Sequence, residues 1–182
     1  SSYLAAKIDA METRRVSETL NIQTELIMPG HTNPIGNLMG GNLLSWMDVC
    51  TGISAMNHSG GISVTASLDN VSFNLPIKMG DIVILKSFVT RAFSTSMEVI
   101  CEVFIKDIKT QAEVKSHEAF FAFVSLDYET KRPIKVSPVV PETDREKELF
   151  ESALHRRELR LINAGKLKPK DAVTLRDYFD EI

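Results

Sequence analysis

Cysteine is scarce in this chain, which has only Cys50 and Cys101 among its 182 residues. Each lies in an apolar run, and neither has a neighbour at the spacing of metal ligands. This pattern argues against a disulfide framework and against a zinc site. Two buried free thiols are typical of a reducing compartment, so we predict a cytoplasmic protein without a metal.

Long apolar runs and clusters of basic residues are also missing. No stretch approaches the roughly 18 to 20 apolar residues of a membrane span, and the N-terminus lacks the pattern of a signal peptide. The formal net charge of −3 and the absence of a Lys/Arg run argue against nucleic-acid binding. We therefore predict no membrane and no nucleic-acid partner, although a local site for a small polyanion stays open.

Known hydrolase motifs built on histidine or serine are absent as well. The four histidines show no HxxxH or HxE spacing, and no serine nucleophile elbow occurs. Metal-dependent hydrolysis and serine-based hydrolysis are both disfavoured. The chemistry, if there is any, must come from other residue types.

Composition and charge predict one globular domain with a charged tail. Apolar residues make up 43% of the chain, enough for a sizeable core. We expect residues 1–15 to be loosely ordered, residues 16–140 to form the domain, and residues 141–182 to form a helical extension. In that extension, Thr143 and Glu146 match a capping box, Gly165 ends the helix, and Pro169 starts a second one.

The domain is predicted to be α+β, with one long helix against an antiparallel sheet. Turn residues and β-branched residues delimit strands at 20–28, 62–75, 81–93, 97–107 and 113–127, and the helix spans about 42–57. No βαβ alternation occurs. The apolar phase of the second strand switches near Asn70, which predicts a β-bulge there.

Two strands carry further expectations. In the strand at 97–107, an apolar face alternates with Glu98 and Glu102, which predicts a half-exposed strand. Residues 119–124 are apolar on both faces and therefore need cover on each side. A helix would supply one cover and a second subunit the other, so a dimer is expected.

The most informative residue is Asp48. It is the only Asp, Glu, Lys or Arg between Leu26 and Leu68, in a chain that is one quarter charged. It sits in an apolar helical run, which predicts a buried carboxylate without an ion partner. Such burial would raise its pKa and suit a general base or nucleophile, whereas the alternative is a helix acid that simply faces solvent.

A set of motifs around Asp48 resembles one enzyme family. The stretch HTNPIGNLMGG (residues 31–41), followed by WMD (residues 46–48), LPI (residues 75–77) and Gly80-Asp81, is similar to the hotdog-fold acyl-CoA thioesterases of the YciA and brain acyl-CoA hydrolase type. The resemblance covers about residues 20–143. It implies a hotdog fold, in which a curled antiparallel sheet wraps the helix, and hydrolysis of acyl-CoA to a carboxylic acid and coenzyme A without a cofactor.

The resemblance also implies the site and the assembly. Asp48 matches the general base or nucleophile, and Asn33 matches an asparagine that comes from the opposite subunit. Two protomers join their sheets with the active sites at the seam, and the dimers commonly form hexamers as trimers of dimers. Independently, the helix N-terminus at Gly41 offers free N–H groups and a partial positive charge for the thioester oxygen.

The sequence leaves alternative roles open for Asp48 and Asn33. Asp48 would draw a proton from water or attack directly to give a mixed anhydride, and the sequence does not separate the two. Asn33, which precedes a proline, is also a good turn former in its own right. A hotdog dehydratase would be expected to use a histidine where this helix offers Asp48.

Further candidates would contact the substrate. Coenzyme A carries phosphates that favour Arg or Lys near the site. The substrate-binding candidates are Gly40, Thr65, Ser67, Arg91, Thr95, Ser96, Lys131 and Arg132. Two positions depart from the family pattern, because His31 stands where relatives often have an acid and Leu75 where they often have a base.

A non-catalytic acyl-CoA sensor on the same fold is the alternative function. A sensor of the DNA-bound type would need a basic helix-turn-helix segment, and the residues before the domain show none. The sequence leaves the acyl chain length open.

Overall fold

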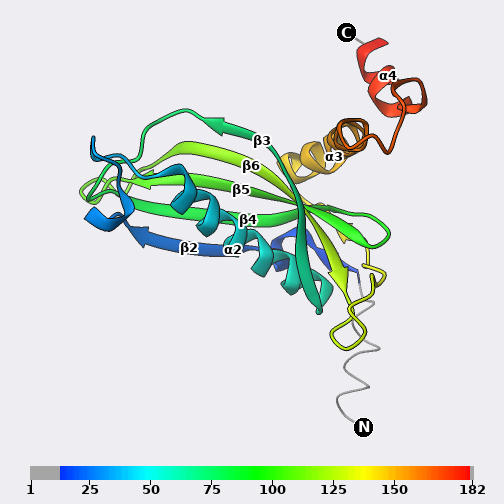
Figure 1. Ribbon diagram of the computed structural model, residues 1–182, viewed down its shortest axis with the longest axis horizontal. Helices are drawn as coiled ribbons and strands as arrows, with labels where there is room; N and C mark the ends of the chain where they lie inside the picture. Colours follow the sequence, from blue (N-terminus) through cyan, green and yellow to red (C-terminus); the bar gives the residue numbers. More distant parts are fainter. Residues whose placement is uncertain (1–12, 181–182) are drawn as a thin grey trace. The chain divides into compact units, whose positions relative to one another are not determined.

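The computed structural model describes residues 13–180, and the chain divides into two compact units after Val140. The first unit is a five-stranded antiparallel sheet with helix α2, Gly40–Ser59, lying across one face (Figure 1). The second unit is helical. The predicted α+β architecture, one long helix against an antiparallel sheet, is confirmed.

Helix α2 starts and ends where glycines permit it. Its N-cap is Met39, so the helix begins two residues before the predicted Asn42. At the other end Gly60 adopts the left-handed conformation (φ 66°) and its N–H donates to the carbonyl of Met56 at 2.9 Å. The side chains that face the sheet recur at helical spacing: Leu43, Met47, Cys50, Thr51, Ser54, Ala55 and His58.

The sheet has the strand order β2-β4-β5-β6-β3, so β2 and β3 form its two edges. Each strand lies within three residues of its predicted bounds: β2 Asn21–Leu26, β3 Ile62–Phe73, β4 Ile82–Ala92, β5 Ser96–Lys106 and β6 Glu113–Leu126. All neighbouring pairs are antiparallel. The chain crosses between edges through α2, which connects the β2 side to β3.

Edge strand β3 is irregular. Its register against β6 shifts between Thr65 and Ser67 and again between Asp69 and Ser72. Asn70, which lies inside the second shift, has a φ of 50°. The predicted bulge near Asn70 is therefore confirmed, and the bulge at Thr65 is an additional one.

Strand β5 corrects the sequence prediction of a half-exposed strand. Glu98 is fully buried and Glu102 is 8% exposed, so both faces of the strand are covered. β5 is the middle strand of the five, and its neighbours supply partners for the acids. Thr90 donates to Glu98 Oε1 at 2.7 Å, and the Lys115 ammonium lies 2.7 Å from Glu102 Oε2. A buried carboxylate is tolerated when it is paired in this way.

The face of β6 that points away from α2 also differs from the prediction. Phe121 and Phe123 are 2% exposed on the helix side, and Phe120 and Ala122 on the other side are 6% exposed. Both faces are thus buried in the single chain. The argument for a dimer cannot rest on this strand.

Polar contacts buried between α2 and β4 hold the helix on the sheet. The Ser54 hydroxyl donates to the carbonyl of Ser87 at 2.9 Å, and the Ser87 hydroxyl donates to the carbonyl of Cys50 at 2.9 Å. Asn21 of β2 donates to the same Cys50 carbonyl at 3.3 Å. Cys50 and Cys101 are both buried free thiols.

Short elements complete the first unit. Arg14–Arg15 form strand β1, which pairs in parallel with β7, Val139–Val140. These two residues belong to the segment 1–15 that was expected to be loosely ordered, and residues 1–12 of that segment lie outside the described residues. The 3-10 turns η2 and η3 span Val16–Thr19 and Pro29–His31.

The second unit contains α3, Asp144–Asn163, the 3-10 turn η4, Pro169–Asp171, and α4, Val173–Asp180. The predicted capping box is present, since Thr143 accepts from the Glu146 N–H at 3.2 Å and Glu146 accepts in return. The Glu158 carboxylate accepts from the N–H groups of Thr174 and Leu175, which fixes the start of α4 against α3. Between residues 13 and 180, no helix combines the length and the apolar character that a membrane crossing requires.

His58 makes stability depend on pH. It is 2% exposed, and burial lowers its pKa despite the opposing hydrogen bond to the Ser137 carbonyl at 2.7 Å. The pKa of His58 is lower in the folded state than in the unfolded chain, where it is about 6.5. The resulting stabilisation is fully present above that pH and is lost as the pH falls further. We expect the unfolding free energy measured by urea denaturation to decrease from pH 7 toward pH 5. The decrease should not exceed about 1.4 kcal/mol per pH unit for this proton.

In the variant His58→Gln, the unfolding free energy should decrease less steeply between pH 7 and pH 5 than in wild type. His117, whose pKa is also lowered by burial, supplies the remainder in both proteins. Identical pH slopes for wild type and variant would exclude His58 as a contributor.

Candidate active site

Asp48 lies in the middle of α2, and its carboxylate is hydrogen-bonded to edge strand β3. The Thr65 hydroxyl donates to Asp48 Oδ1 at 2.5 Å. Both residues are exposed in the single chain, so the predicted burial of Asp48 is wrong for the protomer. The physical reason is the orientation of the helix, since its buried stripe runs through Met47 and Cys50 and leaves Asp48 on the other side.

The surroundings of Asp48 remain apolar, as the sequence indicated. Val49 and Met56 on the same helix are 53% and 44% exposed. Asp48 forms no ion pair with any residue of the described range 13–180. The carboxylate thus lies on an exposed apolar surface with a hydroxyl as its hydrogen-bond donor.

Asn33 shapes the turn that leads into α2. Its Oδ1 accepts from the N–H groups of Ile35 at 3.1 Å and Asn37 at 3.0 Å, which is an Asx turn. Its own N–H donates to the carbonyl of Asn37 at 2.8 Å. The side-chain oxygen is therefore used inside the turn, and only the Nδ2 group remains to donate to a ligand.

The N-terminus of α2 offers two more donors. No side chain caps it, and the N–H groups of Gly40 and Gly41 find no acceptor within the described part of the chain. A Cβ built on either glycine would meet nothing within 4 Å. The space in front of these N–H groups is open, as an anion or oxyanion site at a helix N-terminus requires.

A cleft of about 420 Å³ adjoins the Asn33 turn and the first turn of α2. Its wall is mostly apolar, with Leu38, Leu43, Phe73, Leu75, Pro76 and Ile77, and its polar members are Asn33, Asn37, Gly40, Asn74 and His117. The sequence analysis did not single out His117 as a site residue. Its position could have identified it, because every second residue from 117 to 123 faces the core, and the others are the apolar Ala119, Phe121 and Phe123.

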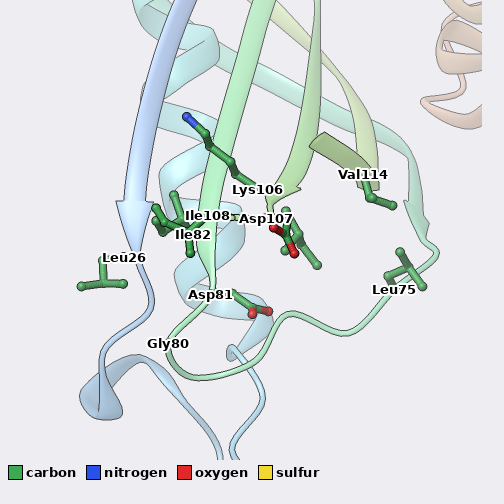
Figure 2. Close-up of a pocket in the computed structure, with 10 residues that line it drawn as sticks. Leu26, Leu75, Gly80, Asp81, Ile82, Lys106, Asp107, Ile108 and Val114 are labelled. Carbon is green, nitrogen blue, oxygen red and sulfur yellow. The ribbon is translucent and has the colours of Figure 1, made fainter. Parts of the chain in front are cut away.

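A larger cleft of about 650 Å³ lies where β2 and β5 end and β4 and β6 begin (Figure 2). Its two carboxylates already serve in turns. Asp81 accepts from the Lys78 N–H at 2.8 Å, and Asp107 accepts from the N–H groups of Lys109 and Thr110. The bond from the Thr110 N–H is the main cause of the lowered pKa of Asp107. Both acids thus stabilise the turns that border this cleft.

The carboxylate and the helix N-terminus are separated within one protomer. Gly41 and Asp48 lie on the same straight helix seven residues apart, which corresponds to about 10 Å along the axis. A carbonyl held at the Gly41 N–H is thus out of reach of Asp48 of the same chain.

Comparison with known proteins identifies relatives of this chain. Residues 35–112 match the model of the family described as Thioesterase superfamily. The uncharacterized acyl-CoA thioester hydrolase YkhA of Bacillus subtilis is 38% identical over 149 residues, covering 82% of this chain and 86% of the relative. An acyl-CoA hydrolase from Staphylococcus aureus, solved with butyryl coenzyme A and coenzyme A, aligns with a TM-score of 0.80 and 34% identity, covering 85% of this chain and 96% of that one.

The chain belongs to the Thioesterase superfamily. The predicted family and the hotdog fold are thereby confirmed. An apo-hexameric acyl-CoA thioesterase is also similar, with a TM-score of 0.80, 36% identity and coverage of 84% and 97% of the two chains. By contrast, this chain spans 24% of the mouse acyl-coenzyme A thioesterase 11, to which it is 37% identical. Further structures of the S. aureus hydrolase have an aspartate, a threonine or an asparagine replaced by alanine.

The structure of this thioesterase-family member brings some predicted residues together and separates others. Asp48 meets Thr65, and Asn33 shares a cleft with Gly40. Ser67 instead donates to Asp69 at 3.2 Å. Thr95 and Ser96 form the β4–β5 turn, where their carbonyls accept from Ser125 and Phe93.

The basic candidates lie on different parts of the sheet. Arg91 pairs with Glu98, and both belong to the face opposite α2, because Cys101, three residues further, contacts Cys50. Lys131 and Arg132 are exposed in the loop after β6. Lys131 has a φ of 58° and places its ammonium 4.4 Å from the centre of the Tyr128 ring.

The two positions that depart from the family pattern have local partners. His31 packs edge-on against Trp46 at 5.0 Å, and its Nδ1 accepts from the Met28 N–H at 3.1 Å. Leu75 is 41% exposed and lines both clefts. His31 therefore braces the loop against α2.

Two substitutions should separate the turn role of Asn33 from its free donor. Asn33→Asp keeps the acceptor for Ile35 and Asn37, so we expect an unfolding free energy close to that of wild type. Asn33→Ala leaves both N–H groups without their acceptor and should cost about 1 kcal/mol. Chemical denaturation at pH 7.5 measures both. Equal destabilisation by the two variants would contradict the Asx turn as the stabilising element.

Proposed function

We propose that this protein hydrolyses acyl-CoA thioesters to a carboxylic acid and coenzyme A, with Asp48 as the catalytic carboxylate. The observation that carries the proposal is the contact between Asp48 and Thr65 on an exposed apolar face, together with the free N–H donors at the N-terminus of the same helix about 10 Å away. Family membership supports the reaction class. The catalytic roles rest on the geometry and on one comparison of spacing.

That spacing matches the substituted residues of the S. aureus hydrolase. In that enzyme the replaced asparagine precedes the replaced aspartate by 15 residues, and the replaced threonine follows the aspartate by 17. Asn33, Asp48 and Thr65 have the same order and the same two spacings. The three positions therefore correspond as a set, which supports assigning all three to the site.

A second copy of the chain completes the site. Because about 10 Å separates Gly41 from Asp48 along α2, the donors of one protomer need the carboxylate of another. Two copies related by a two-fold axis would place the Asn33 turn and Gly41 of each beside Asp48 of its partner. Edge strand β3 and the exposed side chains Val49, Met56 and Val64 provide the surface for that contact.

The chemistry follows from this arrangement. The N–H groups of Gly41 and Gly40, at the positive end of the α2 dipole, stabilise the oxygen of the attacked carbonyl. Asp48 Oδ1 is held by Thr65, so Oδ2 is left to take a proton from water as the water oxygen attacks the carbonyl carbon. The Asn33 Nδ2 group donates to that water or to the carbonyl. Collapse of the tetrahedral intermediate expels the coenzyme A thiolate.

Direct attack by Asp48, which forms a mixed anhydride that water then cleaves, fits the same geometry. Both routes use the oxyanion site and the free carboxylate oxygen. The proposal covers either route.

The coenzyme A phosphates are assigned to the loop after β6. Lys131 and Arg132 follow Leu126, which pairs with Ile62 only three residues before Thr65, so this loop lies at the same end of β3 as the catalytic carboxylate. Arg91 is less suited because it belongs to the opposite face of the sheet. A trimer of dimers, a cytoplasmic location and independence from cofactors remain predictions.

Thiol release from acetyl-, hexanoyl- and palmitoyl-CoA tests the function and its chain-length preference together. We expect release with at least one of the three by the wild-type protein. Asp48→Asn should lower kcat by about two to four orders of magnitude, because the base or nucleophile is lost. Binding of all three thioesters without any release would instead identify an acyl-CoA sensor.

Matched variants sharpen this test. Asp177→Asn, at another exposed helical aspartate, should retain the wild-type rate. Thr65→Val should lower kcat less than Asp48→Asn, because the carboxylate survives but loses the hydroxyl that orients it. Near-normal turnover of Asp48→Asn, with its oligomeric state unchanged, would remove Asp48 from the mechanism.

Mixed assemblies test the shared site. Asn33→Asp and Asp48→Asn chains should each be nearly inactive alone, whereas a mixed dimer contains one site with both residues intact. Statistical mixing at equal amounts, which makes half the dimers mixed with one intact site each, should restore about one quarter of the wild-type activity. No recovery in mixed dimers verified by mass spectrometry would show that each site lies within one chain.

A further inference from the structure

His117 is a buried side chain that the mechanism above does not use. It is 6% exposed, and it lines the cleft shared with Asn33 and Gly40. Its strand register pairs it with Val103 and with Phe73, so its ring points to the α2 side of the sheet. Phe73 packs edge-on against the ring at 5.1 Å and fixes its plane.

The hydrogen bonds around His117 assign its tautomer. The Ser116 hydroxyl donates its single proton to the carbonyl of Val103 at 3.1 Å. His117 Nδ1 lies 2.9 Å from the same hydroxyl oxygen, and we assign Nδ1 as the donor in this contact because the hydroxyl proton is directed to Val103. Nδ1 therefore carries the proton and Nε2 carries a lone pair. Burial also lowers the pKa of His117, which favours this neutral form.

Nε2 is a hydrogen-bond acceptor without a donor in the part of the chain that the structure describes. It has no hydrogen-bond partner among the described residues, and it is not sealed off, since the partnerless buried polar atoms there belong to His58, Ser125 and Thr174. An acceptor in such a cleft is costly when an apolar group covers it. The ligand of this cleft should therefore bring an N–H or O–H group to His117.

The lining indicates which half of an acyl-CoA provides that group. Besides His117, the cleft contains the amide side chains of Asn33, Asn37 and Asn74. A hydrocarbon acyl chain would leave these polar groups unsatisfied, whereas the pantetheine arm has two amides with a donor and an acceptor each. Its first amide N–H lies three bonds from the sulfur, and the cleft begins at Gly40, beside the oxyanion donor Gly41.

We propose that His117 determines recognition of the thiol half of the substrate, with Nε2 accepting a hydrogen bond from an amide N–H of the pantetheine arm. This inference rests on the proposed thioesterase function. An O–H on a hydroxylated acyl group would present the same chemistry, so the test separates the two sources.

The test compares two small thioesters that differ in one group. The S-acetyl thioester of N-acetylcysteamine carries the amide N–H, and its analogue replaces that N–H by an ester oxygen. We expect wild type to prefer the amide by about tenfold in kcat/KM, the effect of one hydrogen bond to a buried acceptor. His117→Leu should reduce the ratio to about one, and His117→Gln, which retains an acceptor, should keep part of it. The control His155→Leu, in the second unit, should keep the wild-type ratio.

Three results would overturn the inference. The first is an unchanged amide preference in His117→Leu, and the second is no preference in wild type although both thioesters are cleaved. The third is a preference for 3-hydroxybutyryl-CoA over butyryl-CoA that His117→Leu removes while the amide preference persists, because the acyl half would then occupy the cleft. Should His117→Leu fail to fold, Ser116→Ala replaces it, since the Nδ1 proton loses its acceptor and can move to Nε2; an unchanged ratio there counts against the inference.

Nitrogen-15 NMR of the imidazole rings decides the point independently of turnover. We expect His117 Nε2 to be unprotonated at pH 7.5, with a signal that shifts when coenzyme A is added. Calorimetry confirms that coenzyme A binds. Failure of thiol release with this shift present would refute the proposed function alone, whereas binding without any shift at His117 would refute the inference alone.

Discussion

The buried polar contact between α2 and β4 is the constraint on which the site depends. The Ser54 hydroxyl of α2 donates to the carbonyl of Ser87 in β4, and the Ser87 hydroxyl donates to the carbonyl of Cys50 in α2. Breaking any of these bonds would leave a polar group buried without a partner, which costs about 1 to 3 kcal/mol. These bonds fix the rotation of the helix about its axis. A turn of about 100°, one residue, would direct a different side chain toward β3 in place of Asp48.

The rotation of α2 explains why the site has two halves. With the Cys50 side against the sheet, Asp48 emerges beside Thr65 at the edge, while the free N–H groups of Gly40 and Gly41 point into open space at the helix end. The length of helix between them is fixed by backbone geometry. In the proposed mechanism, the acid and the oxyanion donors of one chain serve different substrate molecules, and a second copy related by a two-fold axis completes each site.

Much of this fold could be predicted from the sequence, because local signals agree with one another. Gly60-Gly61, Pro29-Gly30 and the alternation of β-branched residues delimit the elements, and the phase switch near Asn70 identifies the bulge. The residues of the Asn33 turn and the Asp48 helix were identified by their unusual composition and by family resemblance. The capping box could be predicted from two residues alone, Thr143 and Glu146, which are three positions apart.

What the sequence did not predict depends on contacts between distant segments. The exposure of Asp48 depends on which helix face the serines hold down, and a lack of charged neighbours does not reveal that face. Glu98 looked like a solvent-facing residue, yet Thr90 of the next strand supplies its partner. The acceptor on His117 follows from the Ser116 hydroxyl being committed to Val103, a contact across strands that no local pattern reports.

The two register shifts in β3 also bear on unwanted association. A long unpaired edge would accept almost any extended polypeptide, which is the usual route to sheet aggregation. Here the shifts after Thr65 and Asp69 divide the edge into short straight stretches. A foreign strand finds only a few consecutive backbone groups in phase with this edge. In the proposed dimer, the bulges would therefore disfavour pairing of β3 with unrelated strands.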